Sequence, residues 1–536
     1  MPIKRLAVIL LAMLLVLSGC GGGVAGGKHI SKNGGTLIIG IESEADTLDP
    51  SSASGWVTMR INNQIYEPLI GEDLSKSSKE APVPKLIPIL ATSYSKSDDG
   101  KTYTFNLRKN VKFQDGTPFN AQAVAFNLKR LTDPKFKYYY KLGAARTFRA
   151  LQYNKGYKII NDYKIQIILS KPFADFPRML GEINSLQIVS PAAVKKYGNE
   201  QLGNHPVGTG PFKFKSRQRG SNITLVKNKD YWGKKAYLDK VIFRPMSNSS
   251  SRVLALQNNS VDMIAVPPAD ALAKLKQQKF KILSGTPPHV WYLTFNMDNP
   301  IMKNVKVRQA INYAIDRKQI ANNLLKGSVK PAYTIQSPAN LAFDPSKKWY
   351  SYDPAKAKQL LKQAGYPNGF STTLQTSVDG SGQLMPTAIA QWIQRDLKKV
   401  GINLKISTTE WIAYVAQYNM GMPKSVGMNQ MSSGRTTPYF LSMIANSKFM
   451  APGGYNSGRY HDPKLDKVLD DATTAVSQKK SLALWKKAEN MMMTNPGWAP
   501  IVNDSAPYVL STNVHGFVIP AEEWYSLAKV WVENKN

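Results

Sequence analysis

TYTFNLRKNVKFQDGTPFNAQAVAFNLKR, residues 102–130, is the stretch that decides the fold. It opens with a strict alternation, because polar residues separate Tyr103, Phe105 and Leu107. A period of two places these apolar side chains on one face, which predicts a half-buried strand. A turn is expected next, at residues 109–110.

The second half of this stretch predicts a returning strand and then a helix. Val111 and Phe113 continue the alternation, so we expect them to start a strand that returns beside the first. A turn at residues 115–118, DGTP, precedes Asn120, whose side chain can cap a helix. The apolar face of that helix is Ala121, Val124, Ala125 and Leu128.

Two further helices are predicted from their capping residues. Asp353 precedes Pro354, which suits the first helical position, and Gly365 can take the left-handed conformation that ends a helix. Asp316 predicts another helix start, with Gln319 as its capping partner. Strands and helices are mixed along the chain, which indicates the α/β class. A length of 536 residues favours two or three domains.

The N-terminus has the pattern of an export signal. Lys4 and Arg5 are followed by an apolar run, residues 6–17, that is shorter than the roughly 20 residues needed to span a bilayer. The run ends in LSGC, which resembles the bacterial lipobox and implies cleavage before Cys20. A plain secretory signal with a chance cysteine is the alternative. We therefore expect a lipoprotein signal peptide at residues 1–19.

Cys20 is the only cysteine, so its lipidation would leave no thiol for a disulfide. The expected location is extracytoplasmic, with the lipid on the outer face of the cell membrane. Residues 20–35 are rich in glycine and predict a flexible tether. The folded body is expected to start at Thr36, just before an apolar run that predicts a buried strand.

The chain is strongly basic, since 70 Lys and Arg against 36 Asp and Glu give a net charge of +34. Nucleic acid would be one partner for such a charge, but the export signal and the dispersed positive residues argue against it. Anionic wall polymers, anionic lipid head groups and an acidic habitat remain open explanations.

Blocks along the chain resemble bacterial family 5 extracellular solute-binding proteins, the dipeptide, oligopeptide and nickel-binding group. Among them are YEPL, PVGTGPF, YDP and PGWAP. The blocks fall in family order across nearly the whole mature chain. They are residues 42–50 with 66–69, 90–130, 206–233, 293–320, 352–369 and 455–500.

The resemblance implies a two-lobed periplasmic-binding-protein (type II) fold with an extra subdomain on the first lobe. It also implies a monomer that captures a peptide or peptide-like ligand by hinge closure and passes it to ABC importer permease subunits. Hinge segments are expected near 281–292 and 500–512. The expected division is a first lobe at 36–280 with the extra subdomain at about 51–204, a second lobe at 281–510 and a C-terminal return at 511–536.

The ligand-binding stretch of peptide-binding members matches residues 431–438, MSSGRTTP, only in part. Gly434, after Ser433, stands where those members carry an aspartate for the peptide ammonium, and Arg435 follows. Either another carboxylate binds the ammonium, or the ligand lacks one, as would a blocked peptide, an oligosaccharide or an anionic solute. Arg435 could hold a carboxylate in two hydrogen bonds, or else point to solvent.

Two tryptophans and two methionines complete the candidate ligand contacts. Trp411 stands where peptide-binding relatives often place a cleft tryptophan, and Trp56 falls in a loop expected at the cleft mouth. Met428 and Met431 could form an adaptable wall. Packing in the core is the alternative for Trp411 and for both methionines.

The sequence favours binding over catalysis. It contains no nucleophile elbow, zinc-protease helix, P-loop or dinucleotide fingerprint. Asp470-Asp471 and Glu522-Glu523 are adjacent pairs, which we interpret as solvated faces. Five histidines are present, none at metal-ligand spacing, so neither a metal nor a cofactor is expected, and nickel is a minor alternative. A wall receptor or adhesin and a hydrolase are the alternatives from other classes.

Overall fold

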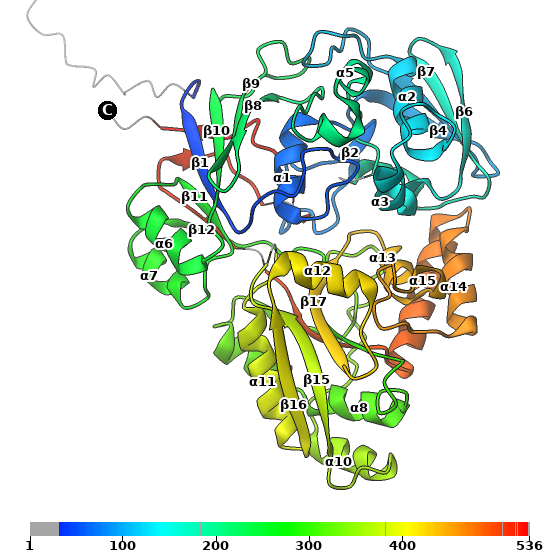
Figure 1. The fold of residues 1–536 in the computed structure, drawn as a ribbon, viewed down its shortest axis with the longest axis vertical. Helices are drawn as coiled ribbons and strands as arrows, with labels where there is room; N and C mark the ends of the chain where they lie inside the picture. Colours follow the sequence, from blue (N-terminus) through cyan, green and yellow to red (C-terminus); the bar gives the residue numbers. More distant parts are fainter. Residues whose placement is uncertain are drawn as a thin grey trace, which may run out of the picture.

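The computed structural model describes residues 32–182, 185–380, 382–505, 507–519, 521–522 and 524–533. Two lobes lie one above the other along the long axis of the molecule and meet in its middle (Figure 1). The predicted signal peptide, Cys20 and most of the tether lie outside the described residues. In the described part of the chain, no helix is long and apolar enough to cross a membrane.

The upper lobe contains a seven-stranded mixed sheet of order β12-β19-β11-β1-β10-β9-β8 and a four-stranded antiparallel sheet of order β4-β5-β7-β6. The strands of the larger sheet are β1 (Thr36–Ile41), β8 (Phe212–Gln218), β9 (Asn222–Lys227), β10 (Lys240–Pro245), β11 (Met263–Ala265), β12 (Lys281–Leu283) and β19 (Tyr508–Leu510). The smaller sheet and two short pairs contain β4 (Ala91–Lys96), β5 (Thr102–Leu107), β6 (Asn154–Asn161), β7 (Lys164–Leu169), β2 (Ile70–Glu72) with β3 (Leu86–Pro88), and β20 (Val514–His515) with β21 (Trp531–Val532).

Helices lie beside both sheets of the upper lobe (Figure 1). They are α1 (Trp56–Ile65), α2 (Ala121–Thr132), α3 (Lys141–Leu151), α4 (Phe176–Gly181), α5 (Pro191–Leu202), α6 (Ser249–Gln257) and α7 (Ala271–Gln277). The close packing of α1 depends on two glycines, because a Cβ atom at Gly208 or Gly210 would lie 2.2 or 2.6 Å from a carbonyl oxygen near the end of that helix.

The lower lobe is built on a six-stranded sheet of order β14-β18-β13-β17-β15-β16. Its strands are β13 (His289–Phe295), β14 (Lys330–Pro331), β15 (Phe370–Ser377), β16 (Ile402–Thr409), β17 (Met428–Gly434) and β18 (Trp498–Asn503). Its helical segments are α8 (Val305–Ala314), α9 (Arg317–Gln319), a π-helix (Ile320–Leu324), α10 (Pro354–Gln363), α11 (Pro386–Lys398), α12 (Trp411–Met420), α13 (Phe440–Ala445), a 3-10 helix (Ser447–Phe449), α14 (Pro463–Thr473) and α15 (Gln478–Thr494).

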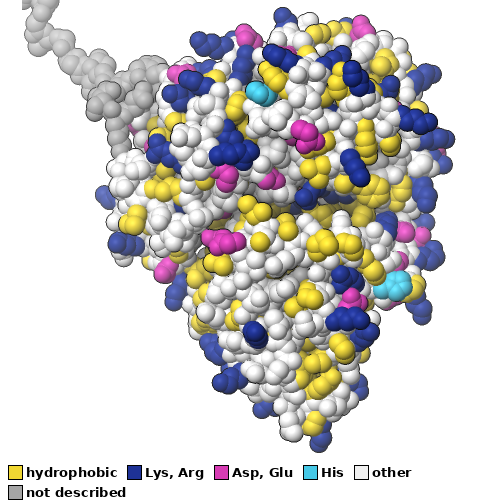
Figure 2. Space-filling view, viewed as in Figure 1, with side chains coloured by type: hydrophobic (Ala, Val, Ile, Leu, Met, Phe, Trp, Pro, Cys, Tyr) yellow, Lys and Arg dark blue, Asp and Glu magenta, His cyan; other side chains and the backbone are white. Residues whose placement is uncertain are grey.

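The chain passes between the lobes at two places. It leaves β12 at Leu283 and enters β13 at His289, then leaves β18 at Asn503 and enters β19 at Tyr508. A groove runs between the lobes on the face shown in Figure 2, and hydrophobic side chains gather along it. Lysine and arginine side chains are scattered over the same face rather than collected in one patch. The exact hinge residues and domain limits stay a prediction.

The opening stretch of sequence folds largely as expected. Tyr103, Phe105 and Leu107 are buried on one face of β5, and the residues between them are more exposed. Asn120 caps α2, since its Oδ1 accepts a hydrogen bond of 3.0 Å from the backbone N–H of Ala123. The predicted half-buried strand and the capped helix are therefore confirmed.

The predicted returning strand at Val111 and Phe113 is wrong. Both edges of β5 are already paired, with β4 on one side and β7 on the other, so no edge is left for this segment. Residues 111–119 instead form a loop closed by a single bridge between Lys112 and Pro118. The alternation correctly indicated burial, because both side chains are at most 2% exposed, but burial does not specify a pairing partner.

The two other predicted helix starts are also present. Asp353 caps α10, with its Oδ1 accepting from the N–H of Lys356 at 2.8 Å, and Gly365 follows the helix with a φ of +89°. Asp316 caps α9, with its Oδ1 accepting from the N–H of Gln319 at 3.1 Å. This second helix is only three residues long and continues as the π-helix.

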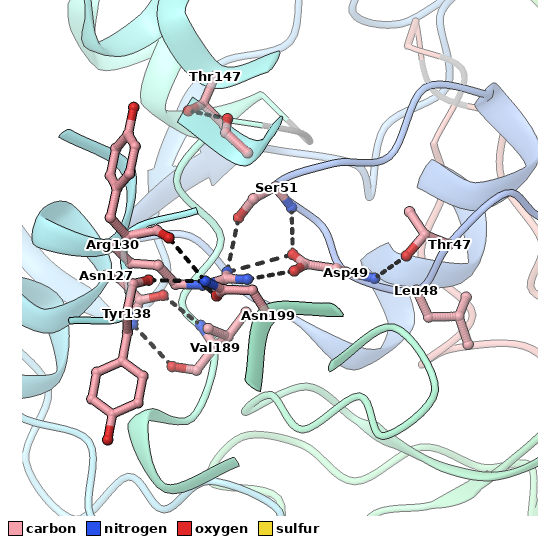
Figure 3. Close-up of polar contacts among 12 residues, drawn as sticks. Thr47, Leu48, Asp49, Ser51, Asn127, Arg130, Tyr138, Thr147, Val189 and Asn199 are labelled. Atoms are coloured by element: carbon pink, nitrogen blue, oxygen red, sulfur yellow. Dashed lines mark hydrogen bonds and ion pairs between the residues drawn. The ribbon is translucent and has the colours of Figure 1, made fainter. Parts of the chain in front are cut away.

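A buried ion pair ties the loop after β1 to α2 and α5 (Figure 3). Arg130 of α2 pairs with Asp49, and the two side chains are 0% and 2% exposed. Arg130 Nε also donates to Asn199 Oδ1 at 2.8 Å, and the N–H of Ser51 donates to Asp49 at 2.9 Å. Each charge therefore has both a counter-ion and further hydrogen bonds, the condition under which burial of an ion pair is tolerated.

Candidate ligand-binding site

The segment that follows β17 inserts into the upper lobe and forms the centre of the junction between the lobes. The backbone N–H of Thr436 donates to Glu522 Oε1 at 3.0 Å, and its hydroxyl donates to Glu72 Oε1 at 2.9 Å. The hydroxyl of Thr437 donates to Asp175 Oδ2 at 2.9 Å. Carboxylates of the upper lobe and the C-terminal return thus hold a lower-lobe segment.

Arg435 lies beside this segment and is 6% exposed. Its Nε atom is 3.5 Å from Glu182 Oε2, and its guanidinium group lies 4.5 Å from the centroid of the Trp56 ring. The alternative in which Arg435 points to solvent is therefore wrong. Its contact with a ligand stays a prediction.

Trp56 forms an aromatic wall of the junction. It is the first residue of α1 and is buried, so its expected place in a loop at the cleft mouth is wrong. Its ring lies 4.7 Å from that of His289 and 6.1 Å from that of Trp524, measured between centroids. Burial, and then the charge of Arg435, lowers the pKa of His289 well below its ordinary value, which favours the neutral imidazole.

Glu72, Asp175, Glu182 and Glu522 form what we call the acidic cluster. Burial raises the pKa of Glu72 and of Glu182, and nearby arginines oppose the rise. Burial and then the charges of Glu72 and Glu182 raise the pKa of Glu522 well above its ordinary value. Burial raises the pKa of Asp175 to about 6. The junction therefore holds several carboxylates that are costly to ionise without a neighbouring cation.

Some residues of β17 lie in the hydrophobic core, and others lie near the junction between the lobes. Met428 pairs with Phe295 and is 0% exposed, and Met431 pairs with Tyr292 within a second apolar cluster. Both methionines thus lie where the packing alternative placed them. Ser433, at the far end of β17, is partly buried.

Gly434 is required by the backbone that passes it. A Cβ atom at this position would lie 1.9 Å from the carbonyl oxygen of Pro288, in the segment that enters β13. An aspartate at position 434 would therefore displace the crossing between the lobes.

Trp411 begins α12 and supports the lower wall of a cavity between the lobes. A Cβ atom at Gly380 would lie 2.3 Å from its ring, so Trp411 packs directly against the segment around this glycine. That segment lines a cavity of about 230 Å³ together with Glu42 and Arg252 of the upper lobe. Trp411 is thus behind the wall formed by this segment.

A second cavity, of about 490 Å³, is also lined by both lobes. Tyr103, Asp175 and Arg178 line it from the upper lobe, and Leu341 and Val476 from the lower lobe. Asp175 belongs to the acidic cluster and accepts from Thr437, so this cavity reaches one residue of the cluster.

Sequence reasoning missed most of the acidic cluster. The predicted place of Glu522 on a solvated face is wrong, because Glu522 is 2% exposed and accepts a hydrogen bond from Thr436. A signal was available, since Glu182 and Glu522 each interrupt an apolar or aromatic stretch, MLGEI and IPAEEWY. In the described part of the chain, no group of three or more His, Cys, Asp or Glu residues could hold a metal ion.

Comparison with known proteins places this geometry in a family. Residues 85–451 match the model of the middle region of bacterial extracellular solute-binding proteins, family 5. The glutathione-binding proteins GsiB of Shigella dysenteriae serotype 1 and Escherichia coli strain K12 are each 31% identical over 500 residues, which is 91% of this chain and 93% of the relative.

Solved structures agree over nearly the whole length. The periplasmic binding protein DppA from Helicobacter pylori, in complex with peptide STSA, matches with a TM-score of 0.85 at 28% identity and covers 94% of this chain and 99% of its own. The dipeptide-binding protein from Pseudoalteromonas sp. SM9913, in complex with Met-Leu, matches with a TM-score of 0.82 at 25% identity and covers 93% and 100%. The predicted α/β periplasmic-binding-protein fold is confirmed. The chain belongs to the bacterial extracellular solute-binding proteins of family 5.

Proposed function

We propose that this protein captures peptides or peptide-like solutes outside the cytoplasm and presents them, chemically unchanged, to the permease subunits of an ABC importer. The observation that carries the proposal is the junction itself, where both lobes supply charged and aromatic side chains around residues 435–437. The relatives are described as binding glutathione, the peptide STSA or Met-Leu. These ligands support the proposal that this protein binds a peptide-like solute.

The mechanism is closure of the two lobes around the ligand. Contacts such as Thr436 to Glu72 join residues 364 positions apart in the sequence and form only when the lobes meet. A ligand that touches both lobes binds the closed form better than the open one and shifts the population toward it. Ligand at about 100 times its Kd would stabilise the closed protein by about 2.7 kcal/mol.

Peptide binding and closure can be measured together. The purified mature chain would be mixed with glutathione, Met-Leu and the peptide STSA, and then with a wider pool of short peptides. We expect at least one peptide to raise the Tm and, at saturation, to reduce the radius of gyration in small-angle scattering. A matched set of oligosaccharides serves as the control and is expected to do neither.

Each failure of this experiment has its own meaning. Binding of an oligosaccharide, with no effect of any peptide, would overturn the peptide proposal. A peptide that raises the Tm but leaves the radius of gyration unchanged would overturn closure.

The lipid anchor at Cys20 is part of the same proposal. The sequence LSGC and the glycine-rich tether after it support a protein held near its importer by lipid. The Cys20→Ser variant is expected to leave the membrane fraction and appear in the soluble extracytoplasmic fraction or the medium, with unchanged peptide affinity. Retention of the variant on the membrane would contradict the anchor.

A further inference from the structure

A third cavity, of about 250 Å³, lies within the upper lobe and is lined by no residue of the lower lobe. Residues of β2, β3 and the C-terminal return form most of its walls. Ser75, Ser526 and Lys529 line it and are exposed, so the cavity opens to solvent. It is therefore separate from the groove between the lobes, where the peptide-like ligand is expected.

The charged groups that line this cavity are mostly acidic, although the whole chain carries a net charge of +34. Glu67, Glu72 and Asp73 line it, against one cation, Lys529. Both oxygens of Glu67 are already used, because they accept hydrogen bonds from three neighbouring side chains. Lys529 is exposed, so water screens its charge. The charge of the walls favours a positively charged occupant.

Glu72 has one carboxylate oxygen without a donor. Its side chain is 0% exposed, and its Oε1 atom accepts from Arg178 at 2.6 Å and from the hydroxyl of Thr436 at 2.9 Å. Its Oε2 atom accepts no hydrogen bond from any described residue. A buried carboxylate oxygen normally finds a donor, and leaving it without one is costly. Because Glu72 lines the cavity, a molecule bound there can supply the missing donor.

The size and the walls of the cavity limit the rest of this molecule. A cavity of about 150 Å³ with apolar walls holds one benzene molecule. The larger volume here leaves room for one ring and a short chain. Apolar side chains from β3 and the C-terminal return, Ile87, Ile89, Val518 and Trp524, favour an aromatic or branched alkyl group.

We propose that this cavity binds a small organic amine in its protonated form, with an apolar body about the size of a phenylethyl group. The ammonium group donates to Glu72 Oε2, and the apolar body packs against Ile87, Ile89 and Val518. The site goes beyond the proposed function, because it lies outside the groove that takes the transported solute.

Glu72 also connects this site to closure of the lobes. Its Oε1 atom accepts from Thr436 of the lower lobe, a contact that forms only when the lobes meet. An ammonium group at Oε2 keeps the carboxylate ionised, and an ionised carboxylate is the stronger acceptor. The amine therefore favours the closed form, and amine and peptide each strengthen the binding of the other. This consequence rests on the proposed function.

Calorimetry with phenethylamine and hydrocinnamate tests the site. The two probes have the same ring and similar size, but they carry opposite charges at neutral pH. Phenethylamine is expected to bind about tenfold or more tightly than hydrocinnamate, since only the amine can donate to Glu72. Saturating phenethylamine is expected to raise the affinity for the best-binding peptide by about threefold or more, and not to compete with it.

Variants place the amine in this cavity. Val518→Phe and Ala528→Phe fill it, and each is expected to lose about tenfold or more in affinity for phenethylamine while peptide affinity without the amine is unchanged. Ala271→Phe is the matched control, because it adds the same ring to α7 at a residue that does not line the cavity. Glu72→Gln is expected to abolish the preference for phenethylamine over hydrocinnamate. Melting of each unliganded variant verifies folding, and the second filling variant serves if one fails to fold.

The outcomes separate the site from the proposed function. The amine site is overturned if phenethylamine does not bind, if hydrocinnamate binds as tightly, if both filling variants keep the native affinity for the amine, or if the amine competes with peptide. In each of these cases the proposed function stands, because peptide affinity is measured without the amine. Binding of the amine in the cavity without any change in peptide affinity would overturn the connection to closure. If no peptide binds, the proposed function falls, and the probes and filling variants still decide the amine site.

Discussion

Replacing Arg130 with methionine is expected to lower the free energy of unfolding by about 3–5 kcal/mol. The substitution keeps most of the side-chain volume but leaves the Asp49 carboxylate, 2% exposed, without its cation. It also removes the donor to Asn199, a residue that binds the backbone around Tyr138. The measurement is chemical unfolding of the mature chain, monitored by fluorescence, and the expected result is a clearly lower midpoint.

Two further variants make this prediction specific. Lys129→Met changes the neighbouring charge on α2 and is expected to alter the free energy of unfolding by no more than about 0.5 kcal/mol. Adding Asp49→Asn to Arg130→Met is expected to recover part of the loss, since no unpaired buried charge then remains. An unchanged midpoint for Arg130→Met would show that the ion pair contributes nothing to stability.

Features whose cause is local in the sequence could be predicted. Asn120 and Asp353 cap their helices through the backbone three residues ahead, so residue type and spacing were sufficient. The alternation at Tyr103 likewise predicted the buried face of β5. The overall fold could not be predicted from local patterns alone. It was predicted from blocks of sequence that resemble one family and occur in the same order along the chain.

Features whose cause is distant could not be predicted from local patterns. The segment at Val111 does not form a strand beside β5, because β4 and β7 already pair with both edges of β5. Glu522 is buried because Thr436, 86 residues earlier, reaches it from the other lobe. The surroundings of Arg435 depend in the same way on Trp56 and Glu182, which come from distant parts of the chain.

Replacing Arg435 with glutamine is expected to lower peptide affinity by about 100-fold or more. In the closed form, the Nε atom of Arg435 lies 3.5 Å from Glu182 Oε2, and its guanidinium group stacks on Trp56. Removing one partner of a buried ion pair costs about 3–5 kcal/mol, and a desolvated cation–π contact contributes about 2 kcal/mol. In an open form, water solvates both the Arg435 guanidinium and the Glu182 carboxylate. The substitution therefore destabilises mainly the closed form, and peptide affinity falls with it. Each tenfold change in affinity corresponds to about 1.4 kcal/mol.

Calorimetry and small-angle scattering with the best-binding peptide would measure this effect. Arg435→Lys is expected to lose about tenfold, because it keeps the charge but not the planar group that stacks on Trp56. Arg459→Gln is the control, since Arg459 pairs with Asp298 within the lower lobe at 2.9 Å and is partly exposed. It is expected to leave affinity and compaction unchanged. An Arg435→Gln variant that binds and compacts like the native protein would mean that the lobes close without this contact, and the junction would then be a consequence of closure rather than its cause.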